Sequence, residues 1–243
     1  MNGSRASPIV QEQYCIAQRR IFRWHTYQII CFGAIFVCCT ISAFCLSYAF
    51  LPLQPDCLLF AEWNLTVDHA SKSVYINYDQ IHWGHRNHCS LTLYTQVAAS
   101  LAAFMSCWFF AFFRPRRAPR RRRSNSTAST LVLPTLIVSL VFLIITCVAW
   151  VTVLLGVVDW CGSIKAELGS CKFSDEYEFK PSWNIRSIDY FGFMTGSLIF
   201  GALGCALWLV VVASLSLRWC MHIDFPKLYF LERVKDSPGS PSV

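Results

Sequence analysis

The positions of the charged residues divide the chain into long apolar segments separated by shorter polar ones. Four segments contain no Asp, Glu, Lys or Arg, and they run over residues 26–50, 91–113, 131–158 and 190–217. A helix needs about 20 apolar residues to cross the hydrocarbon core of a bilayer, and each segment is longer than that. The pattern predicts an all-α membrane protein, a bundle of four transmembrane helices.

The first apolar segment is not typical of a cleaved signal peptide. Signal peptides have an apolar region of about 7–15 residues after a short basic stretch. Here a polar segment over residues 1–25 precedes a longer apolar run. We therefore expect the first span to be retained as a signal-anchor.

The basic residues predict the orientation of the bundle, because Lys and Arg near the spans stay on the cytoplasmic side. Fifteen of the 21 basic residues fall in residues 1–25, in the link 114–130 with its seven arginines, and in the tail 218–243. Both termini and the link are therefore expected to be cytoplasmic. The loops 51–90 and 159–189 then face the lumen or the cell exterior, in the plasma membrane or an endomembrane of the secretory route.

Two tripeptides fit the acceptor pattern for N-linked glycosylation. Asn64 begins Asn-Leu-Thr in the first lumenal loop, and Asn125 begins Asn-Ser-Thr directly after the arginine run. Because glycans are added on the lumenal side, we expect Asn64 to be glycosylated and Asn125 to remain unmodified. A glycan on Asn125 would indicate the opposite orientation.

Four of the 13 cysteines, Cys57, Cys89, Cys161 and Cys171, fall in the two lumenal loops. An even number of cysteines in an oxidising compartment predicts disulfides, and four cysteines allow three pairings. We favour Cys57–Cys89 and Cys161–Cys171, since each pair flanks one loop. Elsewhere, Cys15 and Cys220 lie near span ends, where palmitoylation is one interpretation and a free thiol the other.

The first lumenal loop contains signals for β-strands. Leu65 and Val67 alternate with polar neighbours, and so do Val74, Ile76 and Tyr78, with the turn-like sequence DHASK between the two runs. We expect a hairpin, stapled by the first disulfide, that forms a small β-containing cap on the bundle. The second loop is more polar and is expected to be a shorter, less regular hairpin or coil.

Three histidines in the first loop, His82, His85 and His88, follow one another at a spacing of three residues. Such a cluster fits a zinc site or a pH sensor, and it also fits an exposed polar loop that is rich in histidine. Neither Arg86 nor a disulfide-bonded Cys89 would help to bind a metal ion. The sequence does not decide between these interpretations, and we predict no metal or cofactor.

The spans carry no ionisable groups, which argues against a charged pore or an ion-coupled transporter. The chain also lacks the H-E-x-x-H, G-x-S-x-G and Gly-rich phosphate-loop motifs, so we do not expect an enzyme.

The fourth span carries small residues at a spacing of four. Gly192 and Gly196 form one such pair, and Ser197 and Gly201 form another. Small residues at this spacing allow two helix backbones to approach closely. We favour packing inside the bundle over an interface with a second copy or another protein.

The link RPRRAPRRRRSNSTAST is rich in arginine and proline and is expected to be a solvated linker. Its charge would attract anionic lipid headgroups, at about 1 kcal/mol per basic residue near the surface. Because two spans clamp the link, we do not expect it to bind nucleic acid. Ser124 and Ser126 follow the arginines, and phosphorylation there would cancel part of the charge.

Short motifs in the loops resemble those of one family. Cys-Leu-Leu-Phe begins at Cys57 and Asn-Leu-Thr-Val at Asn64, a cysteine opens the second span, and Trp-Cys ends at Cys161 with Ser-Cys ten residues on. The chain thus resembles the transmembrane protein 179 family of four-pass proteins over residues 27–217. The resemblance implies the four-span architecture. Claudin-like proteins and tetraspanins fit less well, because this chain lacks the Gly-Leu-Trp of the former and the Cys-Cys-Gly of the latter.

These features lead to one expected function and one alternative. The favoured hypothesis is a non-enzymatic accessory or adaptor subunit that binds another integral membrane protein through its cap and spans. The alternative is a small channel or transporter formed by self-association.

Overall fold

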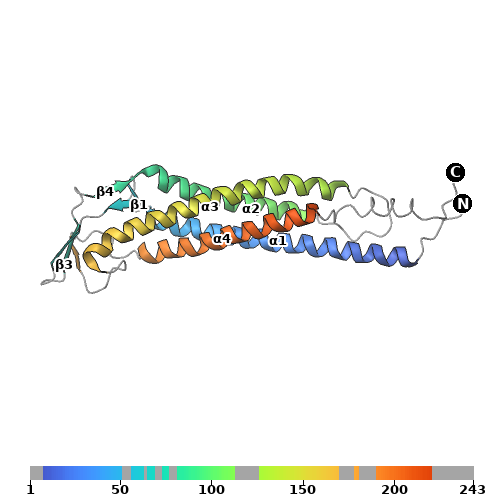
Figure 1. Cartoon of the computed structure of the whole chain (residues 1–243), viewed down its shortest axis with the longest axis horizontal. Helices are drawn as coiled ribbons and strands as arrows, with labels where there is room; N and C mark the ends of the chain where they lie inside the picture. Colours follow the sequence, from blue (N-terminus) through green and yellow to red (C-terminus); the bar gives the residue numbers. More distant parts are fainter. Residues whose placement is uncertain are drawn as a thin grey trace.

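The computed structural model describes residues 8–50, 56–62, 65–68, 73–76, 81–112, 126–169, 178–180 and 190–220. Most of these residues form four helices: α1 (Pro8–Phe50), α2 (Arg86–Phe112), α3 (Ser126–Leu168) and α4 (Tyr190–Cys220). The helices run side by side along the long axis of the molecule (Figure 1). The predicted four-helix bundle is confirmed.

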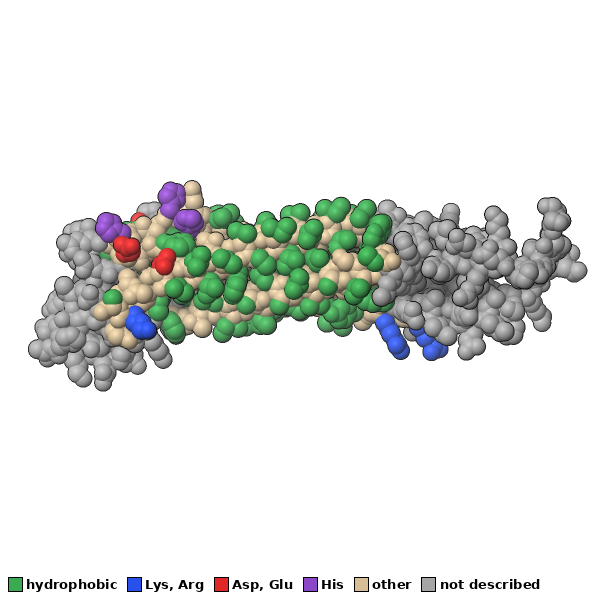
Figure 2. Space-filling model, viewed as in Figure 1, with side chains coloured by type: hydrophobic (Ala, Val, Ile, Leu, Met, Phe, Trp, Pro, Cys, Tyr) green, Lys and Arg blue, Asp and Glu red, His purple; other side chains and the backbone are tan. Residues whose placement is uncertain are grey.

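The described helices contain four segments that are long and apolar enough to cross a membrane: Phe22–Phe50, Arg86–Phe112, Val132–Ala166 and Phe191–Cys220. Their outward faces expose large apolar side chains such as Ile30, Ile144 and Leu209. Figure 2 shows hydrophobic side chains over the middle of the bundle on its visible face. Lipid tails are as apolar as these side chains, so the exposed apolar surface fits a bilayer environment.

Short strands lie together at one end of the bundle, which we call the cap end (Figure 1). The described strands are β1 (Cys57–Glu62), β2 (Leu65–Asp68), β3 (Ser73–Ile76), β4 (His82–Gly84) and β5 (Glu178–Lys180). The opposite end, formed by residues 19–28 of α1 and 211–220 of α4, we call the basic end.

The strands form two small sheets. β2 and β3 pair antiparallel, with Leu65 opposite Ile76 and Asp68 opposite Ser73, so the predicted hairpin is confirmed. β5 adds to the free edge of β3 in parallel, and β1 pairs antiparallel with β4. In the second loop, which we expected to be an irregular hairpin or coil, the described residues 178–180 instead form a strand that pairs with β3 of the first loop.

The interior of the bundle contains two hydrophobic clusters. One lies at the cap end and joins the loops to the helices through buried residues that include Leu46, Leu59, Trp160, Ile164 and Met194. The other lies toward the basic end and is built around aromatic rings. Phe32 stacks on Phe110 at 5.7 Å between ring centroids, and Trp208 stacks on Phe142 at the same distance. Trp208 is completely buried, so a bulky residue fills the centre of the bundle here.

The third helix is longer than the apolar pattern predicted. The second lumenal loop was expected to begin at residue 159, yet α3 continues to Leu168. Trp160 and Ile164 lie in this extension and are buried against the cap. Burial of these two side chains stabilises the additional helical turns, although charged residues such as Asp159 and Lys165 interrupt the apolar run.

Candidate functional site

A group of buried polar side chains joins α1 to α4 at the basic end. Arg218 is only 1% exposed, and its Nη1 donates a hydrogen bond to Oε1 of Gln28 at 2.8 Å. Its Nη2 lies 3.2 Å from Nε2 of His25. His25 and Gln28 are three residues apart on α1, so both present their side chains to the same face of the helix. We call these three residues the polar cluster.

Arg218 corrects the expectation that the spans contain no ionisable group. The sequence placed it just after the fourth apolar segment, in the tail, whereas the structure places it in the last turn of α4. A positive charge is favourable there because the carbonyl groups at a helix C-terminus carry partial negative charge. Charged side chains at membrane depth are costly and face partners inside the bundle. The polar cluster therefore aligns the ends of α1 and α4 with a directional contact.

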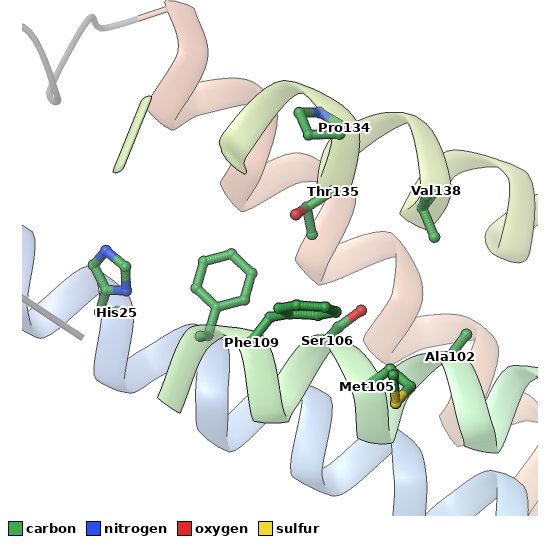
Figure 3. A pocket seen from close by; sticks show the side chains of 9 residues that line it. His25, Ala102, Met105, Ser106, Phe109, Pro134, Thr135 and Val138 are labelled. Atoms are coloured by element: carbon green, nitrogen blue, oxygen red, sulfur yellow. The ribbon is translucent and has the colours of Figure 1, made fainter. Parts of the chain in front are cut away.

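A groove between α2 and α3 opens beside the polar cluster (Figure 3). Its volume is about 290 Å³, and its lining is mostly apolar. His25 lies at one end, and the hydroxyl groups of Ser106 and Thr135 provide polar atoms along the walls. The remaining lining residues are Ala102, Met105, Phe109, Phe110, Pro134 and Val138. Met105 and Val138 are 51% and 43% exposed, so the groove opens onto the membrane-facing surface.

The wall of this groove on α2 carries small residues at a spacing of four. Ala102 and Ser106 line the groove, and Ala98 is exposed one turn further along the same face. We call Ala98, Ala102 and Ser106 the α2 stripe. Small residues at this spacing allow a second helix to approach closely, yet part of this stripe is exposed.

The small residues of α4, in contrast, are covered by the chain's own helices. A Cβ atom placed on Gly196 would lie 3.3 Å from Sγ of Cys45 on α1. One placed on Gly201 would lie 2.9 Å from Cδ1 of Trp150 on α3. Ser197 contacts Ser42 of α1, with 3.2 Å between the two hydroxyl oxygens. These residues pack inside the bundle, as favoured from the sequence, whereas Gly192 is exposed.

The cap is attached to the bundle by a disulfide and by close backbone contacts. Cys57 and Cys89 form the expected disulfide, with their Cα atoms 5.8 Å apart. A Cβ on Gly84 would overlap the carbonyl oxygen of Leu59, so β4 approaches β1 at a distance that only glycine permits. The side chain of Leu59 packs against Gly156 of α3, where a Cβ would lie 2.9 Å from the Cβ of Leu59.

The register of β1 is irregular next to this contact. Cys57 pairs with Gly84 and Glu62 with His82, so the two strands shift register between these points. Phe60 lies in the irregular part with φ of 62°, a conformation that few residues other than glycine adopt. Its ring packs on His88, with 5.3 Å between ring centroids. The bulge directs Leu59 into the bundle and Phe60 to the start of α2.

The three histidines of the first loop are exposed at the cap end. The rings of His85 and His88 are 6.2 Å apart between centroids, while His82 lies in β4. Among the described residues, no group of three His, Cys, Asp or Glu side chains could hold a metal ion.

Several predicted sites fall outside the described residues, including Asn64, Ser124, Asn125 and Cys171. Ser126 is the first residue of α3, so the link 114–130 ends in a helix. Cys161 is disulfide-bonded.

The family model for the transmembrane protein 179/179B claudin domain matches residues 24–226. The chain belongs to this family. The match confirms the resemblance found from the loop motifs, and it covers all four spans. No curated protein and no solved structure gives a significant match.

The claudin description of this family corrects the contrast that we drew with claudin-like proteins. That contrast rested on the Gly-Leu-Trp motif, which this chain lacks. The family match shows that the absence of this motif does not exclude a claudin-like domain.

The polar cluster and the α2 stripe were both missed by sequence reasoning. A weak signal existed for the first, because His25 and Gln28 lie on one face of a span and Arg218 follows another span directly. The α2 stripe has the same spacing as the small residues of α4. Only the packing of the helices shows that the small residues of α4 are covered and that the α2 stripe lies beside an open groove.

Proposed function

We propose that this four-pass membrane protein is a non-enzymatic accessory subunit that binds another integral membrane protein. A transmembrane helix of the partner would pack into the groove between α2 and α3, against the α2 stripe. The observation that carries the proposal is that small residues line a membrane-facing groove that the chain's own helices leave open.

The energetics of helix association in membranes support this choice of site. Lipid tails solvate apolar side chains well, so helices associate through close packing and hydrogen bonds. Ala102 and Ser106 offer close approach, and the hydroxyl groups of Ser106 and Thr135 offer polar contacts within the groove. Met105 and Phe109 project beside them and would flank an inserted helix.

The cap supports a second contact with the same partner. The disulfide and the contacts of Leu59 with Gly84 and Gly156 hold the cap on the bundle. Its exposed rim is polar and includes Asp56, Glu62, His82, His85 and His88. A rigid cap with a polar rim can contact the lumenal part of a partner whose helix lies beside α2, because little conformational freedom is lost on binding.

The proposal includes the orientation of the chain. The distribution of basic residues supports termini on the cytoplasmic side of the plasma membrane or of a secretory endomembrane. In this orientation Asn64 lies on the side where glycans are added, so it would carry one. The arginines of the link 114–130 would interact with anionic lipid headgroups.

The test is site-specific photo-cross-linking of the full chain in cells. A cross-linking residue is placed at Met105 or Val138 in the groove, and at Ile199, an exposed position on α4, as the control. We expect one defined membrane protein to be cross-linked from both groove positions and not from Ile199.

A pair of matched variants then tests the α2 stripe. Ala102→Leu fills the groove and should abolish the cross-link and the co-purification of the partner. Ala206→Leu makes the same change at an exposed position on α4 and should leave both unchanged. Cross-linking from the groove to a second copy of this chain would contradict the accessory function and favour the self-associated channel.

A further inference from the structure

A second groove lies between α1 and α4 at the basic end. Its volume is about 500 Å³. Arg23, Trp24 and Tyr27 of α1 form one wall, and Val210, Ala213 and Leu217 of α4 form the other. The groove is separate from the one between α2 and α3, and the proposed function does not use it.

The α1 wall is basic and aromatic, whereas the α4 wall is mostly apolar. Arg19 and Arg23 are exposed and lie one helical turn apart on α1. Trp24 and Tyr27 follow immediately, with their rings edge-to-face at 6.4 Å between centroids. Tryptophan and tyrosine are enriched at the level of the lipid headgroups, so the arginines lie at that level. The α4 wall beyond them is apolar except for Ser214, whose hydroxyl donates a hydrogen bond to the carbonyl oxygen of Val211 at 2.8 Å.

Among the side chains that the structure describes, the charged ones at this end are all basic. Arg218, next to the groove residue Leu217, adds a buried positive charge between α4 and α1, where it contacts Gln28 and His25. The carboxylates whose side chains the structure describes, Asp56, Glu62 and Asp159, belong to the cap end. Figure 2 shows the acidic side chains on that end of the visible face.

We propose that this groove is a binding site for an anionic phospholipid. Arg23 donates hydrogen bonds to the lipid phosphate, since a guanidinium matches phosphate oxygens with two parallel donors. Arg19 beside it attracts the net negative charge that an anionic headgroup carries and a zwitterionic one lacks. One acyl chain lies between Tyr27 and the α4 wall, where Ala213 leaves room for it. The positive-inside distribution assigns this end to the cytoplasmic leaflet, which carries the anionic lipids.

The experiment is native mass spectrometry of the full chain, delipidated in mild detergent and titrated with phosphatidylserine or phosphatidylcholine. We expect one phosphatidylserine per chain to be retained, and phosphatidylcholine to bind at least about tenfold more weakly. Arg23→Gln should weaken phosphatidylserine binding about tenfold, the effect of losing one hydrogen bond to a charged group. Ala213→Leu, which fills the groove and keeps every charge, should weaken it by a similar factor.

Two controls match these variants. Arg86→Gln removes an exposed arginine at the cap end, and Ala206→Leu enlarges an exposed residue of α4 outside the groove. Both should bind phosphatidylserine as the unmodified chain does. Equal binding of the two lipids would overturn the proposal. Unchanged phosphatidylserine binding by Ala213→Leu would also overturn the proposal, because the lipid headgroup alone would then account for the affinity. Loss of binding only when the arginines of the link are removed would place the lipid there instead.

Discussion

Arg218 of α4 and Gln28 of α1 are 190 residues apart in the chain, and a hydrogen bond of 2.8 Å between their buried side chains joins the two helices. The acceptor is a neutral amide oxygen and the donor is a permanently charged guanidinium. A hydrogen bond to a charged group is worth more than a neutral one, and its loss leaves a charge poorly solvated in the bundle. The contact therefore stabilises one relative position of α1 and α4.

Replacing Gln28 with Leu keeps the bulk of the side chain and removes the acceptor. We expect the free energy of unfolding to fall by about 2 kcal/mol, the range for hydrogen bonds to charged groups. The measurement is denaturant-induced unfolding of the purified chain in detergent. Arg23→Ala, which alters an exposed arginine on the same helix, is the control and should change stability by less than about 0.5 kcal/mol.

A double variant separates the hydrogen bond from a packing effect. Adding Arg218→Met to Gln28→Leu removes the charge that has lost its Gln28 acceptor, and replacing both partners by apolar groups can be nearly neutral. The double variant should therefore be more stable than Gln28→Leu alone. Arg218→Met is also measured alone. If the double variant loses as much unfolding free energy as Gln28→Leu and Arg218→Met lose together, the two side chains act independently.

Gly84→Ala tests the contact between β4 and β1. The new Cβ would overlap the backbone oxygen of Leu59, so the strands must separate. We expect a loss of about 3 kcal/mol, at the upper end for overpacking. The cap should become sensitive to limited proteolysis. Gly162→Ala, in α3 with no atom within 4 Å of the new Cβ, should leave the cap protected.

The disulfide between Cys57 and Cys89 closes a loop with a sequence separation of 32 residues. Replacing both cysteines with serine should destabilise the cap by about 2–4 kcal/mol, mainly by freeing the unfolded chain. Mass-spectrometric mapping of the unreduced protein should recover this pair together with Cys161–Cys171. A peptide linking Cys57 to Cys161 would contradict the predicted pairing.

The orientation predicted from the basic residues also predicts where glycans are attached. Asn64→Gln should remove the N-linked glycan and shift the chain on a gel to the mobility of the enzymatically deglycosylated protein. Asn125→Gln should leave the mobility unchanged, because the arginine run keeps that segment cytoplasmic. The result that would reverse the predicted topology is a glycan that survives Asn64→Gln and disappears in Asn125→Gln.

The sequence by itself determined the four spans and the hairpin of β2 and β3, and it favoured the Cys57–Cys89 disulfide among three possible pairings. These features follow from local rules. A bilayer requires long uncharged helices, alternation of side chains specifies a half-buried strand, and a cysteine on each side of one loop favours closure of that loop. None of them depends on how distant parts of the chain pack.

Only the tertiary structure decided which surfaces are occupied. It paired β5 with β3, buried Arg218 against Gln28, and extended α3 because Trp160 and Ile164 pack on the cap. It also covered Gly196 and Gly201 of α4 while leaving Ala102 of α2 beside an open groove. Small residues spaced by four look alike in a sequence. Whether a neighbouring helix lies over them depends on contacts between residues far apart in the chain, and those contacts leave no periodic signal in either segment.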